Sequence, residues 1–526
     1  MKRIPISRLA LALLGGALFA LLGTLGWQAE HLGQSDPPRA QLTASALTLP
    51  FALALFWLLE HARRKQALPR AEDGVFRTRR AFALLFLCYL PMFAVTFPGS
   101  FAYDVPFQLK QVFTGAYSTH HPLLHTLLLG GCIALGRLAG CVNAGAALYT
   151  LLQMALLALC FALTCASIAR QCGARAARRS ALFFALYPLH MMMAVNATKD
   201  ALFSGCFALA LSLCLEAVRA RQPGRRLFTG ACAALTLSMM LRNNMLYAVA
   251  ALTVLLCLVL RRRERLLCAV CLLSMVLALG GQALLKAVTG AQSGDPCEML
   301  SWPIQQLARA RNLHEDRLTD DEKAAIDELM PGEAWRLYDP TISDPVKFEF
   351  DTQRLLGDLP RYVRVYLSVG AKCPKAYFDA VLMHTYSFLY PYTTYGVSGY
   401  YLQMGVTDAY YDGWYEGERI QSASLFPRVL ASLSWRFGAQ GAMQIPVIGW
   451  VFNMGLIVWV MFYLVLRAAY LGQRAAFGVM LLPVLLWGTF LLGPVMAGRY
   501  IYPFVCALPA MACRARPCAA DPQENG

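Results

Sequence analysis

The sequence predicts a polytopic α-helical membrane protein, on three observations. Of its 526 residues, 58% are hydrophobic and only 15% are charged, whereas soluble proteins carry about 25% charged residues. The mean hydropathy is positive, at +0.47. Thirteen apolar runs are visible, and most approach the length of about 20 residues that a helix needs to cross a bilayer. Strands cannot account for runs this long.

The apolar runs fall into two groups, one before residue 290 and one after residue 443. We place them at 9–27, 43–60, 81–98, 122–139, 145–168, 180–195, 201–218, 227–241, 245–260, 266–286, 445–466, 476–497 and 500–512. The first run follows basic residues, as in a signal peptide. It is longer than a signal-peptide core and no small-residue cleavage site follows, so we expect an uncleaved transmembrane helix.

The basic residues predict the orientation, because Lys and Arg stay on the cytoplasmic side. If all thirteen runs cross, every basic cluster after Arg80 falls outside; if 122–139 does not cross, every cluster falls inside. We therefore expect about twelve crossings, with 122–139 as a juxtamembrane or re-entrant helix in the first large outer loop. Both termini would be cytoplasmic, in a bacterial inner membrane. The net charge of +16 then reports orientation and contact with membrane lipids, and no nucleic-acid motif is present.

Three domains follow from the same pattern. Residues 1–289 form a transmembrane core with an outer loop at 99–121, and 444–526 form the last helices with a short cytoplasmic tail. Residues 290–443 hold 20 of the 31 acidic residues and 14 of the 47 basic ones, which predicts a helical and irregular extracytoplasmic domain. A capping box at Thr319 and Glu322 marks one of its helices. Cys297 and Cys373 lie in this domain, and the sequence leaves open whether they pair.

Under this topology, charged and titratable residues from five separate places reach the outer face. They are Asp104, His121, Lys199, Arg242 and Arg499. Basic residues that only extend to the interface should prefer the cytoplasmic side. A shared task would explain them: cations that bind a lipid-linked phosphate, and a carboxylate that acts as a base. Neighbouring polar residues would support this site, namely His120, Asp200, Asn243, Asn244 and Tyr500.

Each of these residues also has a plain structural interpretation. Asp104 is a favoured N-cap residue, and the two histidines could cap the helix that starts at Pro122. Lys199 and Asp200 could form an interfacial ion pair. His121 and His125 are spaced to ligate a metal from one helical face. The sequence therefore indicates no certain cofactor and leaves a bound divalent metal as an alternative.

The stretch Tyr103-Asp104, followed by His120-His121-Pro122-Leu123, resembles the first outer loop of the GT-C superfamily of membrane glycosyltransferases. There, an acidic residue follows a transmembrane helix and a Pro-Pro-Leu-like motif comes later; here a single Pro replaces the pair. The chain is more similar to an uncharacterised bacterial family of GT-C-like membrane proteins. That similarity also covers Thr198 to Asp200, Arg242 to Asn244, Pro303 to Gln306 with Ala308-Arg309, Tyr338-Asp-Pro and Ser343-Asp-Pro.

This resemblance implies a GT-C-like fold and a glycosyltransferase. It would move a sugar from a polyprenyl-phosphate carrier to an envelope glycan, lipid or protein. Asp104 would be the general base, with a pKa raised by the membrane environment. The donor phosphate would be bound by His121, Lys199, Arg242 and Arg499. Residues 290–443 would cover the site and select the acceptor, with aromatic residues suited to sugar stacking: Tyr386, Tyr390, Trp414 and Tyr415.

Two other classes remain. A transporter or flippase of lipid-linked sugar or polysaccharide would place charges near the midplane and show broken helices in matching halves. A non-catalytic scaffold or sensor would use its acidic outer domain to bind a partner, but it leaves the outer charges without a task. Replacement of Asp104 by Asn separates an enzyme from a scaffold, because only the enzyme should lose function.

Overall fold

The computed structural model describes residues 6–66, 74–102, 104–220, 224–259, 262–393, 404–406, 417–438, 445 and 447–513. Helices make up 81% of the structure, and within these ranges there are isolated β-bridges but no strand. The helices before the outer domain are α1 (Ile6–Leu32), α2 (Pro37–Gln66), α3 (Thr78–Thr96), α4 (Val105–Thr114), α5 (Leu123–Leu138), α6 (Val142–Cys172), α7 (Ala174–Leu186), α8 (Pro188–Val195), α9 (Lys199–Arg219), α10 (Arg225–Leu241), α11 (Asn244–Val259) and α12 (Arg262–Thr289).

The remaining helices form the outer domain and the C-terminal part of the chain. They are α13 (Ser301–Leu313), α14 (Asp320–Leu329), α15 (Asp344–Lys347), α16 (Thr352–Gly357), α17 (Leu359–Lys372), α18 (Pro374–Thr385), α19 (Pro427–Gly438), α20 (Ile448–Phe452), α21 (Met454–Tyr470), α22 (Arg474–Leu491) and α23 (Tyr502–Ala512). Short 3₁₀ helices join several of them, among them η1 (Pro296–Met299) and η7 (Gly498–Ile501).

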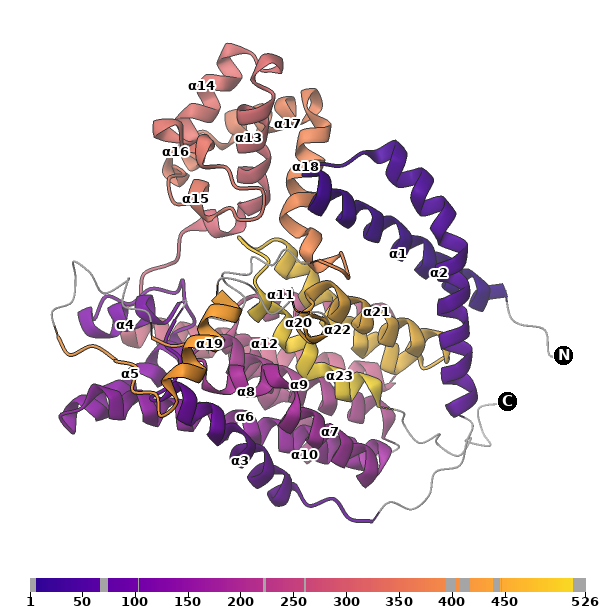
Figure 1. The fold of residues 1–526 in the computed structure, drawn as a ribbon, viewed down its shortest axis with the longest axis vertical. Coiled ribbons are helices and arrows are strands. Elements are labelled where there is room, and N and C mark those ends of the chain that lie inside the picture. Colours follow the sequence, from indigo (N-terminus) through magenta and orange to yellow (C-terminus); the bar gives the residue numbers. More distant parts are fainter. Residues whose placement is uncertain are drawn as a thin grey trace.

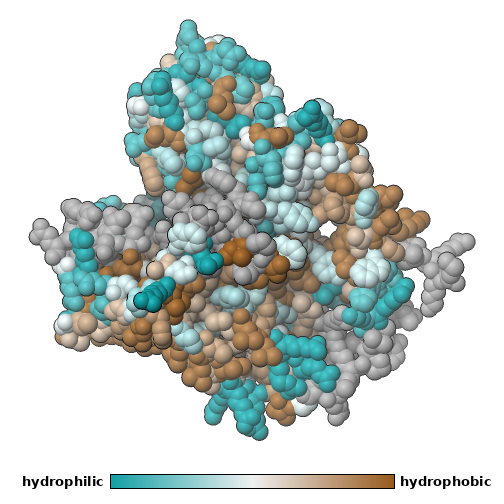
Figure 2. Space-filling model, viewed as in Figure 1, coloured by the Kyte–Doolittle hydropathy of each residue, from teal (hydrophilic) through white to brown (hydrophobic). Residues whose placement is uncertain are grey.

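The protein is an α-helical membrane protein. Among the described residues, seven helices are long and apolar enough to cross a bilayer: α1, α2, α3, α6, α9, α12 and α22. Shorter apolar helices, such as α11 and α21, pack beside them. Figure 2 shows hydrophobic residues over most of the body that these helices form, and hydrophilic residues over the lobe above it. This is the division expected when one part faces lipid and the other faces water.

Two runs predicted as single helices are each broken into two. The run 180–195 is divided between α7 and α8 at Tyr187, which has an extended backbone. Pro188 explains the break, because the residue before a proline avoids the helical region. The run 445–466 is divided between α20 and α21 at Asn453, whose side chain accepts a hydrogen bond of 2.7 Å from the Leu456 N–H. The count of twelve crossings is therefore not established by these helices.

Helix α5, predicted to lie beside the membrane core without crossing it, packs closely on α6. A Cβ at Gly136 of α5 would lie 2.4 Å from the backbone nitrogen of Gly145 in α6. Only glycine allows the two backbones to come this near. In Figure 1, α4 and α5 lie together on the side of the bundle opposite the two termini.

The outer lobe contains α13 to α17 and projects from the helical bundle (Figure 1). It has its own apolar core, built around Ile304, Ile326 and Trp335. The predicted capping box is present: the Thr319 hydroxyl accepts from the Glu322 N–H, and the Glu322 carboxylate accepts from the Thr319 N–H. Trp414 and Tyr415, proposed for sugar stacking, lie outside the described residues.

Hydrogen bonds fix this lobe to the last residue of α22 and to the segment that follows it. The Trp302 indole N–H donates to the Leu491 carbonyl at 2.7 Å, and the Ser343 N–H donates to the Pro494 carbonyl at 2.9 Å. The same segment leads directly into η7, which carries Arg499. The lobe is therefore attached within a few residues of one of the predicted site residues. Cys297 and Cys373 are both buried free thiols, so they do not pair.

Candidate functional site

Two loops that lie far apart in the sequence are joined side by side and position the site. The Ser100 N–H donates to the Val195 carbonyl at 2.9 Å, and the Ala197 N–H donates to the Ser100 carbonyl at 2.8 Å. Gly99 permits this approach: its φ is +140°, and a Cβ there would lie 2.2 Å from the Thr150 hydroxyl oxygen. As a result, the residues that follow the two loops, Asp104 and Lys199, come into contact.

Asp104 stands at the N-cap position of α4 but makes no capping hydrogen bond. Its carboxylate instead accepts a hydrogen bond of 2.5 Å from the Lys199 ammonium and one of 3.3 Å from the Arg499 guanidinium. The Asp104 side chain remains 23% exposed, more than either partner. The structural interpretation as a helix cap is therefore wrong, and Asp104 is the accessible member of a three-residue ionic contact.

The pKa of Asp104 reflects two opposing influences. Burial raises it, but the positive charges of Arg499 and Lys199 act more strongly together and hold the pKa well below its usual range. This is the opposite of the raised pKa expected from the sequence. An ion-paired carboxylate with a low pKa is a weak base, so these cations must move away from Asp104 before it can accept a proton at neutral pH.

His121 is buried beside this contact and is neutral. Its Nδ1 lies 3.3 Å from the Lys199 Nζ and 4.0 Å from the nearer Asp104 oxygen. Because an ammonium group has only donors, Nδ1 must accept, which a neutral imidazole allows. Burial lowers the pKa of His121 well below its ordinary value, and the charge of Lys199 lowers it further. His121 therefore orients Lys199 without adding positive charge.

A second carboxylate, Asp200, stands behind the first. It is 1% exposed and pairs with Arg242 through one oxygen; its other oxygen lies 3.4 Å from the Arg499 Nε. Thr198 caps the start of α9 by accepting from the Asp200 N–H. Arg499 thus lies between two carboxylates, with Asp200 as the buried one. The sequence placed Asp200 only as a supporting residue, and its burial gives it a more central position.

Arg242 lies deeper than the other cations and is held by aromatic rings. Its guanidinium carbon is 4.4 Å from the centre of the Tyr500 ring and 4.5 Å from that of Phe490. Such cation–π contacts stabilise a guanidinium group that is removed from water. The side chain is 9% exposed. Arg242 therefore neutralises Asp200 and supports Tyr500, rather than standing at the accessible side of the cluster with Asp104.

Three of the predicted supporting residues lie outside this set of ionic contacts. The His120 ring packs edge-on against the His121 ring, with the ring centres 4.6 Å apart, and its Nδ1 lies 3.8 Å from the Glu298 carboxylate. Asn243 accepts from Gln282 at 3.4 Å, and Asn244 donates to the Thr489 carbonyl at 3.3 Å. The two asparagines thus link neighbouring helices. The structure thus gathers Asp104, His121, Lys199, Asp200, Arg242, Arg499 and Tyr500 in one cluster.

A buried polar chain that the sequence analysis missed links two of the elements that carry this cluster. His125 contacts Gln108 of α4 at 3.0 Å and the Tyr149 hydroxyl at 2.6 Å, and Tyr149 donates to Gln153 at 2.8 Å. The Gln153 amide then donates to the carbonyls of Ala194 and Asn196, at 3.0 and 2.7 Å. The chain runs from the helix that Asp104 begins to the turn before Lys199. Polar residues in the apolar run 145–168 were its signal in the sequence.

The protons of this chain can be arranged in one direction. The Gln108 Nε2 has no partner, and with that amide turned toward His125 it would donate to Nδ1. His125 would then donate through Nε2 to Tyr149, and Tyr149 to Gln153. His125 is neutral in this arrangement, and both of its ring nitrogens are used. The pair of His121 and His125 is therefore not arranged as metal ligands.

The charged cluster does not resemble a metal site either. Asp104 and Asp200, the two carboxylates that could bind a cation, are each contacted by two cationic side chains. Within the described ranges, no group of three or more His, Cys, Asp or Glu side chains is arranged to hold a metal. What these residues offer is a set of nitrogen donors that face carboxylate oxygens, and an oxyanion is the ligand that such donors favour.

One comparison with known proteins identifies a relationship. Residues 113–521 match the model of a family of unknown function, DUF6020. No curated protein and no solved structure matches the chain. The match includes His121, Lys199, Arg242 and Arg499, and it begins after Asp104. Because it covers well over half of the sequence, the chain belongs to the DUF6020 family.

Proposed function

We propose that this protein is a glycosyltransferase that moves a sugar from a polyprenyl-phosphate carrier to a cell-envelope acceptor. The observation that carries the proposal is the contact of one partly exposed carboxylate, Asp104, with two cations from distant parts of the chain, Lys199 and Arg499. Three cations and two carboxylates form the cluster, so one positive charge is left over. An anionic phosphate would balance it.

The transfer needs one base and one anion-binding group, and the cluster holds both. Asp104 would take the proton from an acceptor hydroxyl while the hydroxyl oxygen attacks the anomeric carbon of the sugar. The bond from that carbon to the phosphate oxygen breaks with its electron pair, and the phosphate leaves with one more negative charge. Lys199 and Arg499 would stabilise this added charge, as preorganised donors do in other transferases. The sugar would be inverted.

The low pKa of Asp104 gives the donor a second role. Lys199 and Arg499 both donate to the Asp104 carboxylate. A donor phosphate would draw both cations toward itself and weaken their hold on Asp104. The pKa of Asp104 would rise, and it would become a stronger base only when the donor is bound. His121 and Asp200 would keep Lys199 and Arg499 in position, with Arg242 as the counter-charge of Asp200.

The finer topology belongs to this proposal. Sugar carriers of this kind are used outside the cytoplasm, so the cluster would lie at the extracytoplasmic face of a bacterial inner membrane. The fold would be GT-C-like with about twelve crossings and both termini inside. Supporting this, the cluster lies at the start of α9, whereas Arg219 at the end of α9 lies among basic residues that predict the cytoplasmic side. The outer lobe would cover the site and select the acceptor.

Donor turnover tests the proposal directly. Protein in nanodiscs would receive labelled polyprenyl-phosphate sugars and crude envelope acceptors, and the release of polyprenyl phosphate would be measured. We expect release by wild type and a loss of about 10²–10⁴-fold in Asp104→Asn, the usual contribution of a general base. Asp316→Asn is the matched control, because it removes the same charge from an exposed position in the outer lobe.

The result also separates the competing classes. If no donor is turned over but labelled lipid stays bound and crosses the bilayer of a proteoliposome, the protein is a transporter of lipid-linked sugar. If Asp104→Asn and Asp316→Asn are equally active, Asp104 is not the base. If no labelled lipid binds, the cluster does not serve a lipid-linked sugar.

A further inference from the structure

A second group of arginines lies at the end of α9, away from the cluster around Asp104. Arg219, the last residue of α9, donates through Nη1 to the Gln171 side chain at 2.8 Å. Its Nε and Nη2 are buried and have no hydrogen-bond partner. These two nitrogens form one edge of the guanidinium group, the edge that binds two oxygens of a carboxylate or phosphate side by side. A complete binding edge is thus buried and unused.

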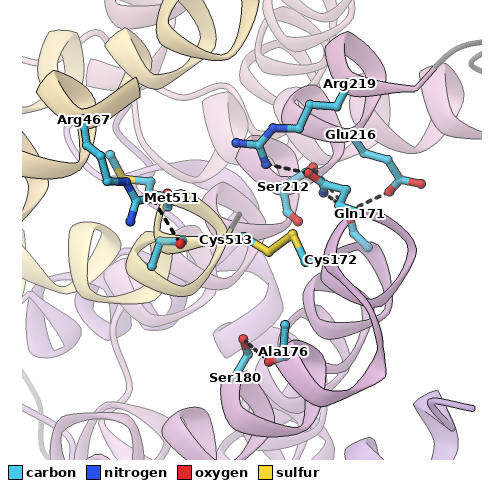
Figure 3. Close-up of a disulfide and its surroundings, with 12 residues drawn as sticks. Gln171, Cys172, Ala176, Ser180, Ser212, Glu216, Arg219, Arg467, Met511 and Cys513 are labelled. Carbon is cyan, nitrogen blue, oxygen red and sulfur yellow. Dashed lines mark hydrogen bonds between the residues drawn. A yellow bond between two sulfur atoms is a disulfide. The ribbon is translucent and has the colours of Figure 1, made fainter. Parts of the chain in front are cut away.

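A neighbouring arginine shows how this edge is used when a partner is present. Arg170 donates through Nε and Nη2 to the two oxygens of Glu216, at 2.5 and 2.8 Å. Ser167 donates to the same carboxylate at 2.6 Å. Figure 3 shows the Glu216 carboxylate and the Arg219 guanidinium pointing to opposite sides, so Glu216 does not serve Arg219. No acidic side chain in the described part of the protein forms an ion pair with Arg219.

A second arginine, Arg467, and a disulfide lie close to Arg219. The charge of Arg467 acts on Arg219, and Figure 3 shows the two side chains reaching toward the disulfide from opposite sides. Arg467 donates to the Met511 and Ala512 carbonyls at 3.0 and 3.1 Å. The disulfide joins Cys172, next to Gln171, to Cys513, next to Ala512. It therefore ties together the two segments that hold the arginines, and keeps like charges near each other.

Arg219 and Arg467 are both positively charged and lie near each other, and one edge of the Arg219 guanidinium is buried without a partner. A bound anion would compensate for this charge. Phosphate fits best. Its oxygens match the Nε–Nη2 edge, and the end of a membrane-spanning helix lies at the level of lipid phosphates. We propose that Arg219 and Arg467 form a binding site for a phosphate group, at the opposite membrane face from Asp104. Its source would be the headgroup of an anionic phospholipid or free phosphate.

Native mass spectrometry in a phosphate-free maltoside detergent tests this site and distinguishes the sources. Wild type would be titrated with phosphatidylglycerol in one series and with inorganic phosphate in another. We expect Arg219→Gln to weaken binding by about tenfold or more, because it removes charge-assisted hydrogen bonds. Arg225→Gln is the control, since it removes the same charge from an exposed position at the start of α10. Retention of phosphatidylglycerol alone identifies a lipid site, and a response to inorganic phosphate identifies a free-phosphate site.

Thermal unfolding supplies a readout that a purely structural arginine would not give. Without phosphate or lipid, Arg219→Gln should be at least as stable as wild type, because it removes an unpaired buried charge. With the bound ligand, wild type should become the more stable protein. Equal binding by Arg219→Gln and Arg225→Gln would overturn the proposal, as would the absence of any binding to wild type. An Arg219→Gln variant that is less stable at every ligand concentration by the same amount would also overturn it.

Discussion

The two ends of α9 both carry charged side chains, but they balance them differently. At the start, Asp200 is almost completely buried and pairs with Arg242 and Arg499, which come from other parts of the chain. At the end, Glu216 pairs with Arg170, whose side chain is 54% exposed. The difference teaches that the same residue types can form a closed internal network or a pair that water still solvates. Removal of a charge should therefore have unequal effects at the two ends.

The largest expected effect on stability comes from Asp200→Asn. This change leaves the buried Arg242 without its counter-charge and removes one of the two carboxylates that Arg499 contacts. Removal of one partner of a buried ion pair costs about 3–5 kcal/mol. Glu216→Gln, the same change at the other end of α9, should cost about 1 kcal/mol or less, because water can solvate Arg170. Thermal unfolding of both variants in nanodiscs measures the difference. Equal losses would show that burial does not distinguish the two ends.

Lys199→Gln should have the next largest effect, on turnover of the donor. Loss of one donor to a developing oxyanion typically lowers kcat by about 10²–10³-fold. Lys199→Arg keeps the charge and should retain part of the activity. Steady-state release of polyprenyl phosphate checks both variants, with Lys286→Gln as the control at an exposed lysine near the end of α12. A change in KM with kcat unaltered would place Lys199 in donor binding alone.

Tyr149→Phe should cost about 1–3 kcal/mol, because it leaves the facing His125 and Gln153 atoms buried without their partner. The chain that links α4 to the turn before Lys199 would be cut at its middle. Tyr247→Phe is the control, since Tyr247 is 59% exposed. Unfolding temperature measures the loss. If both Phe variants match wild type, the chain does not stabilise the site.

The smallest expected effect is a difference in pH dependence at His121. Its pKa in the folded protein lies well below the ordinary value of 6.5, so below about pH 6.5 the unfolded chain binds a proton that the folded protein does not. The stability that the neutral ring contributes is complete above that pH and declines as the pH falls. The unfolding temperature of wild type should therefore fall more between pH 7.5 and 5 than that of His121→Asn. Parallel curves would contradict a buried neutral His121.

The helices could be predicted because long apolar runs have few alternatives. Pro188 explains the helix break at Tyr187, and Asn453 caps the helix that follows the second break. A single proline or polar residue inside an apolar run predicts a helix break only weakly. A shared side of the membrane could be predicted for Asp104, Lys199 and Arg499, because it depends only on the number of crossings between them; which side that is stays a prediction. Their contact could not, because the packing angles of the helices determine it.

The ion-pair partner of each charged residue could not be predicted from the sequence either. Asp104 reads as a helix cap, and only the folded chain brings Lys199 to its carboxylate. The disulfide between Cys172 and Cys513 joins residues that are 341 positions apart. Both cysteines lie next to apolar runs that contain many others, so composition gave no reason to pair them. Cys297 and Cys373, whose pairing the sequence left open, are both free thiols.

The residues of the buried cluster are synthesised at different times. Asp200 and Arg242 leave the ribosome early, whereas Arg499 follows only near the end of the 526-residue chain. At usual synthesis rates, the interval between Arg242 and Arg499 is on the order of tens of seconds. Throughout that time, the first helices hold an incomplete set of charges in or near the bilayer. The cluster therefore lacks one of its cations until the last helices have been synthesised. These helices complete both the membrane part and the charge balance of the site.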